Sequence, residues 1–222
     1  MLEIKGKLIS FEGIEGSGKS TQCRLLAEYL SNRGIPVLQI REPGGTAIGE
    51  QIRAILLNKV NRGMKPLTEF LLFAAARAQV INERILPALQ EGNVVLCDRY
   101  IDSSLAYQGS GRGLGWELID RINEAMGIVL NPHLTILLDI EVDEGLMRAK
   151  LNRKNLPDKM QEGRIEEEDL PFHKRVRGGY LELSRLQSER FRVISAVGSI
   201  EKVNRRVIAA VNNFFPQLKD EL

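Results

Sequence analysis

The sequence predicts an α/β fold in which a parallel sheet of five strands is sandwiched between helices. The prediction rests on five short apolar runs with the length of buried strands, on the helical spacing of apolar residues between them, and on a glycine-rich turn that joins the first strand to the first helix. Alternation of strands and helices favours parallel pairing, because each crossover helix returns the chain to the same end of the sheet.

The strands and helices follow one another along the chain. The predicted strands are centred on residues 8–11, 37–40, 94–97, 135–138 and 192–194. The predicted helices cover approximately residues 19–32, 46–57, 67–91, 116–126, 142–150, 171–188 and 199–215. Gly34, Gly92 and Gly127 fall just past three helix ends, where a left-handed backbone favours glycine. With 222 residues, 43% of them hydrophobic, the chain can bury one substantial core, so we expect a single domain over residues 1–222.

The most informative motif lies between the first predicted strand and the first predicted helix. Residues 13–20 read Gly-Ile-Glu-Gly-Ser-Gly-Lys-Ser and match the P-loop pattern G-x-x-x-x-G-K-[ST]. Backbone N–H groups of such a loop cradle phosphates, its lysine reaches the β- and γ-phosphates, and its serine can ligate Mg²⁺. A glycine-rich turn without a ligand is the alternative. The motif predicts a P-loop NTPase-type fold whose nucleotide-binding residues are Gly13, Ile14, Glu15, Gly16, Ser17, Gly18, Lys19, Ser20 and Thr21.

The composition argues against several classes of protein. Lys and Arg number 31 and Asp and Glu 29, so the net charge of +2 lacks the basic excess of a dedicated nucleic-acid binder. The two cysteines, Cys23 and Cys97, have the spacing of neither a zinc site nor a disulfide framework. The P-loop begins at residue 13, and no apolar run approaches the roughly 18 residues of a membrane span. We therefore expect a cytoplasmic protein that binds neither nucleic acid nor membranes.

Polar residues at the carboxyl ends of the predicted strands carry most of the functional information, because ligands of open α/β sheets bind there. Asp98 follows an apolar strand, where P-loop proteins place an acidic residue of the Mg²⁺ shell, so Ser20 and Asp98 are the predicted metal residues. Arg99 is expected to face the same crevice. The alternative is that Asp98 and Arg99 only form a salt bridge at the sheet edge.

Several arginines are placed to bind a second anion opposite the triphosphate: Arg41, Arg53, Arg77 and Arg99. An acceptor phosphate carries about −1.5 to −2 charges at neutral pH, and arginines would offset its repulsion from the donor. A pair of unit charges about 4 Å apart is worth about 4 kcal/mol at an effective dielectric constant near 20. Solvated surface arginines are the alternative for any one of them.

Phe73 and Arg77 are four residues apart, so they share one face of a helix. The phenylalanine ring could stack on a nucleobase while the arginine donates to a base carbonyl, and the small alanines between them leave room for close approach. Taken alone, a phenylalanine on a helix is more often a core residue.

Residues 148–168 are predicted to form a short helical lid. Between Arg148 and Arg164 the chain is dense in basic residues and is interrupted by Pro157 and Gly163. Phosphoryl transfer needs water to be excluded and charge to be stabilised, and a basic flap closing over the phosphates can supply both. The alternative is a solvated helix-loop-helix surface.

Four motifs occur in a fixed order. They are Phe-Glu-Gly-Ile-Glu-Gly-Ser-Gly-Lys-Ser-Thr at residues 11–21, Arg-Glu-Pro-Gly-Gly-Thr at 41–46, Leu-Phe-Ala-Ala-Ala-Arg at 72–77 and Asp-Arg-Tyr-Ile-Asp-Ser-Ser-Leu-Ala-Tyr-Gln-Gly at 98–109. Together they resemble the thymidylate kinase family, of the bacterial type, over nearly the whole chain. The resemblance implies that ATP phosphorylates dTMP to dTDP with Mg²⁺ in a homodimeric cytoplasmic enzyme.

The resemblance also implies roles for single residues. Glu15 would face the 3′-hydroxyl of the acceptor sugar, and Tyr107 would lie under that sugar. Arg53 and Arg99 would hold the acceptor phosphate. Phe73 and Arg77 would bind thymine, in a pocket lined by Ser103, Ser104 and Gln108. Lys19, Arg99 and Glu15 would be catalytic. Gly16 stands where the eukaryotic type has an arginine, so a catalytic arginine is expected from the lid, with Arg153 and Arg164 as candidates.

Other functions are less well supported by the sequence. A GTPase switch lacks its D-x-x-G and N-K-x-D motifs, and the balanced charge disfavours a nucleic-acid-dependent ATPase. A kinase of another pyrimidine nucleotide, such as dUMP, stays an alternative, because spacing cannot fix base choice. The apolar side of the helix at residues 67–91 could be the dimer face or intrachain core. We assign neither His133 nor His173 a catalytic role.

Overall fold

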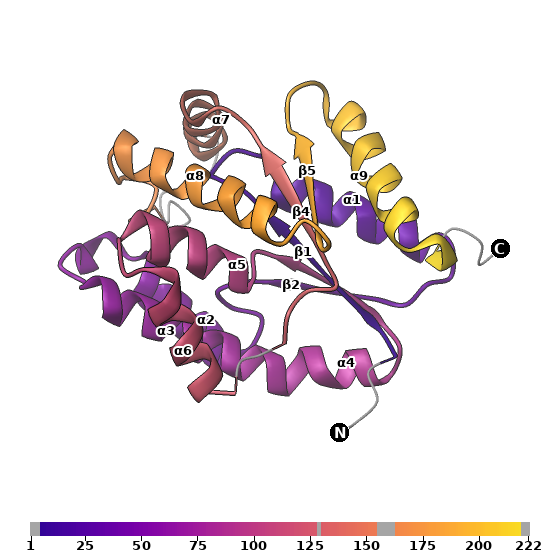
Figure 1. Ribbon diagram of the computed structural model, residues 1–222, viewed down its shortest axis with the longest axis horizontal. Helices are drawn as coiled ribbons and strands as arrows, with labels where there is room; N and C mark the ends of the chain where they lie inside the picture. The colour runs from indigo at the N-terminus through magenta and orange to yellow at the C-terminus, as the bar shows by residue number, and fades with distance from the viewer. Residues whose placement is uncertain (1–4, 128–129, 155–162, 219–222) are drawn as a thin grey trace.

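The computed structural model describes residues 5–127, 130–154 and 163–218. These residues contain one parallel five-stranded sheet, ordered β2-β3-β1-β4-β5 (Figure 1). The strands are β1 (Lys7–Glu12), β2 (Val37–Arg41), β3 (Val94–Asp98), β4 (Leu134–Asp139) and β5 (Phe191–Ser195). Each predicted strand centre falls inside an observed strand, so the predicted fold class is confirmed.

The strand order places β1 in the middle of the sheet. The chain runs from β1 outward to β2, returns to β3, and then crosses β1 to build β4 and β5 on the other side. Ligands of open parallel sheets bind where the strand order reverses, outside the carboxyl ends of the strands. The loop after β1 and the ends of β3 and β4 are therefore brought to one crevice.

Helices cover both faces of the sheet. The α-helices are α1 (Lys19–Ser31), α2 (Ala47–Leu57), α3 (Pro66–Val80), α4 (Leu86–Gln90), α5 (Ile101–Ser104), α6 (Trp116–Ala125), α7 (Val142–Lys154), α8 (Leu170–Leu186) and α9 (Ile200–Phe214). Helices α1 and α9 pack together on one face, while α4 and α8 pack against strands on the other (Figure 1). Helix α7 extends four residues beyond its predicted end, and part of the predicted lid, residues 155–162, lies outside the described residues.

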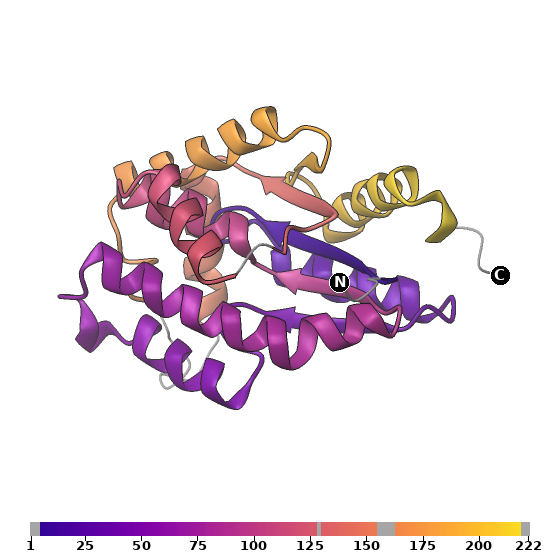
Figure 2. The same cartoon turned by 60° about the horizontal axis from the view of Figure 1, so that its bottom comes forward.

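The predicted helix over residues 67–91 is a continuous helical run with a π-helical turn, η2 (Ile81–Ile85), between α3 and α4 (Figure 2). The turn lies just before Pro87, which has no N–H and whose ring would clash with a preceding carbonyl in a regular α-helix. A wider turn accommodates the proline without ending the helix.

Residues 101–111 form a helical run that the sequence did not predict. Helix α5 continues as a π-helical segment, η3 (Leu105–Gly111). A Cβ atom added at Gly109 would lie 2.6 Å from the ring of Trp116, and one at Gly111 would lie 2.8 Å from Phe172 of α8. These glycines lower helix propensity but allow η3 to pack closely against its neighbours, so tertiary packing overrides the local signal.

A buried ion pair ties α5 to the far side of the sheet. Asp102 is fully buried, and Arg190 donates to its two oxygens over 2.6 and 2.8 Å. The hydroxyl of Thr135 on β4 donates to the same carboxylate over 2.9 Å. A charge in the interior is tolerated only when it is paired and hydrogen-bonded, and both conditions are met here.

Candidate active site

The loop after β1 has the backbone of a phosphate cradle. Gly13, Gly16 and Gly18 have φ values of 137°, 70° and 91°, which L-residues with a side chain rarely adopt. A Cβ atom at Gly13 would lie 2.4 Å from the carbonyl oxygen of Leu138, and one at Gly16 would lie 2.0 Å from that of Gly145 in α7. The glycines therefore allow the loop to fold and to lie against β4 and α7.

Lys19 begins helix α1, and its side chain curls back over the loop. Its Nζ donates to the Ile14 carbonyl oxygen over 2.7 Å and to the Ser17 hydroxyl over 3.3 Å. Burial, and next the charge of Arg99, lower the pKa of Lys19 to about 8. The ammonium group is thus held at the centre of the loop, where it can bind phosphate oxygens.

The two predicted metal residues lie in direct contact. The hydroxyl of Ser20 donates to the carboxylate of Asp98 at the end of β3. Among the described residues there is no cluster of three or more His, Cys, Asp or Glu side chains that could hold a metal by themselves. A hydroxyl and one carboxylate suit Mg²⁺, which keeps several waters and binds substrate phosphates, so this pair fits the predicted role.

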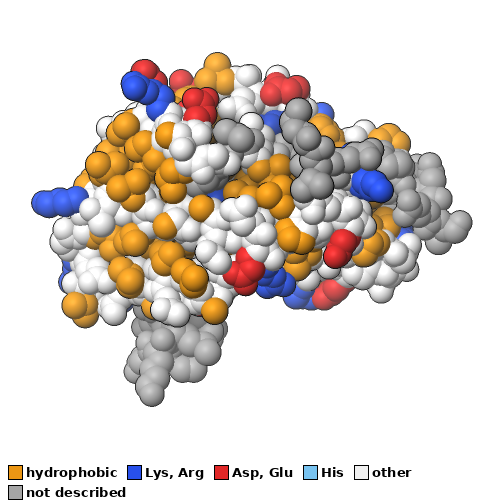
Figure 3. All heavy atoms as spheres, turned by 90° about the horizontal axis from the view of Figure 1, so that it is seen from below, with side chains coloured by type: hydrophobic (Ala, Val, Ile, Leu, Met, Phe, Trp, Pro, Cys, Tyr) orange, Lys and Arg blue, Asp and Glu red, His pale blue; other side chains and the backbone are white. Residues whose placement is uncertain are grey.

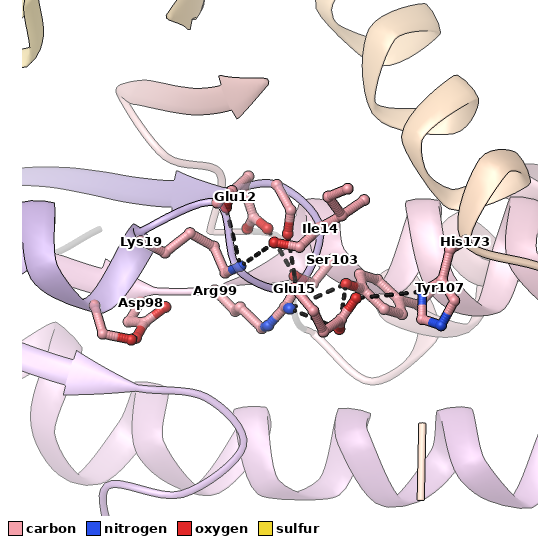
Figure 4. A network of polar contacts seen from close by, with 12 residues as sticks. Glu12, Ile14, Glu15, Lys19, Asp98, Arg99, Ser103, Tyr107 and His173 are labelled. Carbon is pink, nitrogen blue, oxygen red and sulfur yellow. Dashed lines mark hydrogen bonds and ion pairs between the residues drawn. The ribbon is translucent and has the colours of Figure 1, made fainter. Parts of the chain in front are cut away.

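Arg99 lies at the mouth of the P-loop (Figure 4). It has a positive φ of 69°, the only one among the non-glycine residues described. Its guanidinium donates to Glu15 and to the Tyr107 hydroxyl over 3.0 Å each, and to the Gly13 carbonyl oxygen over 3.2 Å. Strained backbone conformations cluster at functional sites, where surrounding contacts hold them in place. About a fifth of the side chain is exposed, so it can still meet a ligand.

Glu15 is buried beside Arg99, and its two carboxylate oxygens differ in their hydrogen-bond partners. Oε1 accepts from Arg99 over 3.0 Å and from the Tyr107 hydroxyl over 2.6 Å. Oε2 makes no hydrogen bond within the described part of the chain, and faces Nδ1 of His173 at 3.4 Å. Burial would raise the pKa of Glu15, but His173, Arg99 and Lys19 hold it below its usual value, so the group is an anion at neutral pH.

A second carboxylate, Glu12, lies beneath this pair at the end of β1. It accepts from the hydroxyl of Ser103 over 2.6 Å, from the hydroxyl of Tyr180 over 2.7 Å and from the backbone N–H of Tyr100 over 2.8 Å. Ser103 and Tyr180 in turn lie 3.4 Å from the guanidinium of Arg99. Burial and the charge of Asp102 raise the pKa of Glu12 to about 7.

The predicted base-binding pair lies on α3, at the carboxyl ends of β2 and β3. Arg77 is fully buried, and it donates to Glu42 over 2.8 Å and to the Tyr100 carbonyl oxygen over 3.2 Å. Its Nη1 is buried without a hydrogen-bond partner among the described residues. Phe73, one turn earlier, is half-buried and packs against the core. At least one nitrogen of the arginine, Nη1, is therefore left to donate to a ligand.

The other predicted substrate residues have different surroundings. The hydroxyl of Ser104 is buried and makes no hydrogen bond within the described residues. Gln108 uses its amide N–H on Glu69 over 2.9 Å. Arg53 donates to the carbonyl oxygen of Pro43, which follows a cis peptide bond, over 3.0 Å. Arg41, in contrast, forms an exposed pair with Glu50.

The two lid candidates are placed differently. Arg153 lies in the last turn of α7, and its side chain lies outside the described residues. Arg164 is buried: it donates to the Leu56 carbonyl oxygen over 2.6 Å and forms an ion pair with Glu69 at 2.7 Å. In this structure the guanidinium of Arg164 is bonded to α2 and α3, so its role in catalysis stays a prediction.

Comparisons with known proteins identify the family of this chain. The family model described as thymidylate kinase matches residues 11–207. The thymidylate kinase of Pelobacter propionicus is 48% identical over 206 residues, which are 93% of this chain and 94% of that protein. That of Syntrophotalea carbinolica is 49% identical over 205 residues, covering 92% and 94%. The chain belongs to the thymidylate kinase family.

A solved structure supports the same family at the level of the fold. The crystal structure of thymidylate kinase from Ehrlichia chaffeensis is 34% identical, with a TM-score of 0.73, over 93% of this chain and 98% of that one. The resemblance inferred from the four motifs is therefore confirmed. The chain is a nucleoside monophosphate kinase of the thymidylate kinase family.

Three residues of this thymidylate kinase site were not identified from the sequence. Glu12 belongs to the first motif but received no role, and Tyr180 and His173 come from α8, more than 150 residues away from the P-loop. Histidine and tyrosine on an amphipathic helix give no local signal of a site. The spacing of seven residues between them, which places both on one face of α8, is the signal that could have been used.

Proposed function

We propose that this protein transfers the γ-phosphoryl group of ATP to dTMP, giving dTDP and ADP. The observation that carries the proposal is a set of buried polar atoms left without hydrogen-bond partners within the described residues: Glu15 Oε2, Arg77 Nη1 and Ser104 Oγ. Buried polar groups are nearly always satisfied, so such atoms on neighbouring elements need an explanation. A nucleotide bound next to Arg99 would supply partners for all of them.

The donor side is served by the P-loop. Its N–H groups and the N-terminus of α1 would hold the triphosphate of ATP, and Lys19 would bind its β- and γ-phosphate oxygens. Ser20 and Asp98 would hold Mg²⁺, which neutralises charge on the phosphates when bound. The backbone φ values of the glycines and the contact of Ser20 with Asp98 support these assignments.

The acceptor side needs no strong base, because the attacking oxygen belongs to a phosphate that is already largely ionised. The oxygen forms a bond to the γ-phosphorus, and the bond to the bridging oxygen of ADP breaks. Arg99 and Arg53 would offset the repulsion between acceptor and donor and align the two phosphates. Phe73, Arg77, Ser103, Ser104 and Gln108 would hold the base, with Tyr107 under the sugar and Glu15 on its 3′-hydroxyl.

Residues 148–168 of this single domain are proposed to act as a lid. Its arginines, Arg153 and Arg164, would stabilise charge on the transferring phosphoryl group. For Arg164 this role requires that the guanidinium leave its ion pair with Glu69. Arg153 lies in the last turn of α7, and this helix packs against the P-loop where Gly145 and Ala149 approach Gly16.

We propose a homodimer joined through the outer faces of α2 and α3. Ile48, Ile55, Leu67 and Leu71 on these helices are between 41% and 52% exposed. Figure 3 shows hydrophobic side chains gathered on the face seen from below. Large exposed apolar surfaces mark interaction sites, and sedimentation equilibrium would test the association.

None of the described helices is long and apolar enough to cross a membrane. We propose a cytoplasmic enzyme that works without nucleic acid.

A coupled ADP-release assay across dTMP, dUMP, dCMP, UMP, AMP and GMP tests the function. The proposal expects the highest kcat/KM with dTMP. The alternative of a dUMP kinase has no support among the matched families and relatives, and preference for dUMP would revive it. A clear preference for AMP or GMP would refute the base pocket of Phe73 and Arg77.

The variant Lys19→Ala tests the donor site in the same assay. Removing an ammonium that stabilises charge in the transition state is expected to lower kcat by about 10³-fold or more, with the fold intact. Circular dichroism and thermal unfolding would verify the fold. Turnover close to that of the unaltered protein would refute the role of Lys19.

A further inference from the structure

His173 is a buried histidine that the proposed mechanism leaves without a role. It lies in the second turn of α8, its side chain is fully buried, and its ring stands edge-on to Phe172 with a centroid distance of 5.3 Å. Neither ring nitrogen makes a hydrogen bond to any residue that the structure describes. An imidazole with two unused polar atoms in the interior is costly unless it serves a site.

The ring faces the P-loop. Its Nδ1 lies 3.4 Å from Oε2 of Glu15, and Figure 4 shows the histidine reaching toward that carboxylate from the side opposite Arg99. The start of α8 is fixed by Asp169, which caps the helix by accepting from the Phe172 N–H over 2.8 Å. The position of the imidazole is therefore set by the helix and by its packing, independently of Glu15.

The carboxylate needs a partner on this side. Arg99 and Tyr107 both bind Oε1, so neither of them gives Oε2 a donor. Oε2 is also the oxygen that can accept from a hydroxyl of a ligand, because Oε1 already has two donors. An ionised carboxylate only accepts hydrogen bonds, so a histidine beside it contributes as a donor through Nδ1–H.

We propose that His173 is a positioning residue that donates from Nδ1 to Oε2 of Glu15 and fixes the plane of that carboxylate for the 3′-hydroxyl of the acceptor sugar. The inference rests on the proposed function, since it acts on the acceptor that Glu15 binds. It assigns the histidine to recognition of the sugar and not to proton transfer. A group that aligns another must be held by packing of its own, and the burial of His173 against Phe172 meets this requirement.

The test compares two acceptors, dTMP and 3′-deoxythymidine monophosphate, which lacks the hydroxyl in question. His173→Leu keeps much of the volume and removes the donor, whereas His173→Asn places an amide N–H near the position of Nδ1. With dTMP, His173→Leu is expected to lose about tenfold or more in kcat/KM, mainly through KM, and His173→Asn to recover most of it. With the 3′-deoxy acceptor, the variants and the unaltered protein are expected to agree within about threefold.

Equal losses on both acceptors, or no loss with dTMP, would overturn the inference. If His173→Leu does not fold, His173→Phe, which also removes the donor, is compared on the two acceptors by the same criterion. His133→Asn is the matched control, because this histidine lies at the opposite end of β1, where it accepts from the Leu8 N–H over 3.0 Å. Failure of the unaltered protein to use dTMP would refute the proposed function, whereas normal use of dTMP with equal losses would refute only the role of His173.

Discussion

Two buried carboxylates that each pair with an arginine, Glu15 and Glu69, differ in how many of their oxygens have hydrogen-bond donors. Glu69 on α3 accepts from Gln108 over 2.9 Å and from two nitrogens of Arg112 over 2.9 and 3.0 Å, and it pairs with Arg164. Glu15 accepts hydrogen bonds through Oε1, and its Oε2 faces His173 and has no hydrogen-bond partner among the described residues. Both oxygens of Glu69 thus have donors without a ligand, whereas Oε2 of Glu15 has no hydrogen-bond donor among the described residues.

This difference between the two carboxylates indicates which arginines can bind a substrate. Along the sequence, Arg99 and Arg164 look alike as basic residues near predicted functional segments. In space, the side chain of Arg164 is 3% exposed and pairs with Glu69, whose two oxygens already accept from Gln108 and Arg112, whereas that of Arg99 is 21% exposed at the P-loop. Burial would raise the pKa of Glu69, but hydrogen bonds from Arg112 and Gln108 outweigh it and lower the pKa, as expected for a permanently ionised structural pair. The carboxylate oxygen without a donor, more than the type of residue, distinguishes the binding site at Glu15 from the structural cluster at Glu69.

The largest expected effect on activity is at Arg99, beside Glu15. Arg99→Ala should lower kcat/KM for dTMP by about 10³-fold, because the acceptor phosphate loses a cation that binds it and aligns it with the donor. Steady-state kinetics with each substrate varied in turn would measure this, and KM for ATP should change by less than about threefold. An equal rise in both KM values would mean that Arg99 supports the P-loop and does not bind the acceptor.

Arg164→Ala should have the opposite profile. Removing one partner of a buried ion pair leaves an uncompensated charge, so the free energy of unfolding should fall by about 3–5 kcal/mol. At saturating substrates kcat should change by less than about tenfold, measured below the unfolding transition. Unchanged stability with a loss in kcat of about 10³-fold would instead identify Arg164 as the catalytic arginine of the lid and would break the comparison.

The carboxyl of Glu12 should make stability depend on pH. Its pKa is about 7 in the folded protein against an ordinary value of 4.5, so between these values the folded state holds a proton that the unfolded chain has lost. Its contribution to the free energy of unfolding is therefore lost as the pH rises through this window. From about pH 5 to about pH 8 the unaltered protein should lose about 2 kcal/mol more than Glu12→Gln does, measured by urea unfolding. Parallel pH profiles for the two proteins would contradict the assignment.

The smallest effect on stability is expected at the surface near the pair of Arg164 and Glu69. Arg62 forms a 2.6 Å pair with Glu167, three residues after Arg164 in the chain, but its side chain is 70% exposed. Arg62→Ala should change the free energy of unfolding by less than about 1 kcal/mol, because water screens such pairs. Thermal unfolding of this variant is the matched control for Arg164→Ala. A loss as large as that of Arg164→Ala would show that the whole segment, and not the buried pair, provides the stability.

Much of this molecule could be predicted from local sequence. The strands, their parallel pairing and the P-loop could be predicted because they depend on the spacing of apolar residues and on glycines, which are visible in short stretches of sequence. Convergence of Asp98 and Arg99 on one crevice followed from the position of strand ends. These predictions hold because each depends on a few adjacent residues or on a general rule of sheet topology.

The remainder depends on contacts between distant segments. The helix over residues 101–111 contains Gly109 and Gly111, whose value lies in packing against Trp116 and Phe172 and cannot be inferred from propensity. The pairing of Arg164 with Glu69 joins residues 95 positions apart. Nothing in a local pattern says which of many arginines will meet which of many glutamates, and so the lid candidate at position 164 could not be distinguished from a structural residue.

The buried pair of Asp102 and Arg190 has a consequence for how such a protein can diverge over time. Its partners are far apart in the chain, yet a change in either one alone would leave the other's charge buried without a partner. Substitutions at these two positions should therefore be rare singly and should occur together, with neutral partners replacing both. An alignment of many relatives would then show the two columns varying in step, even though 88 positions separate them.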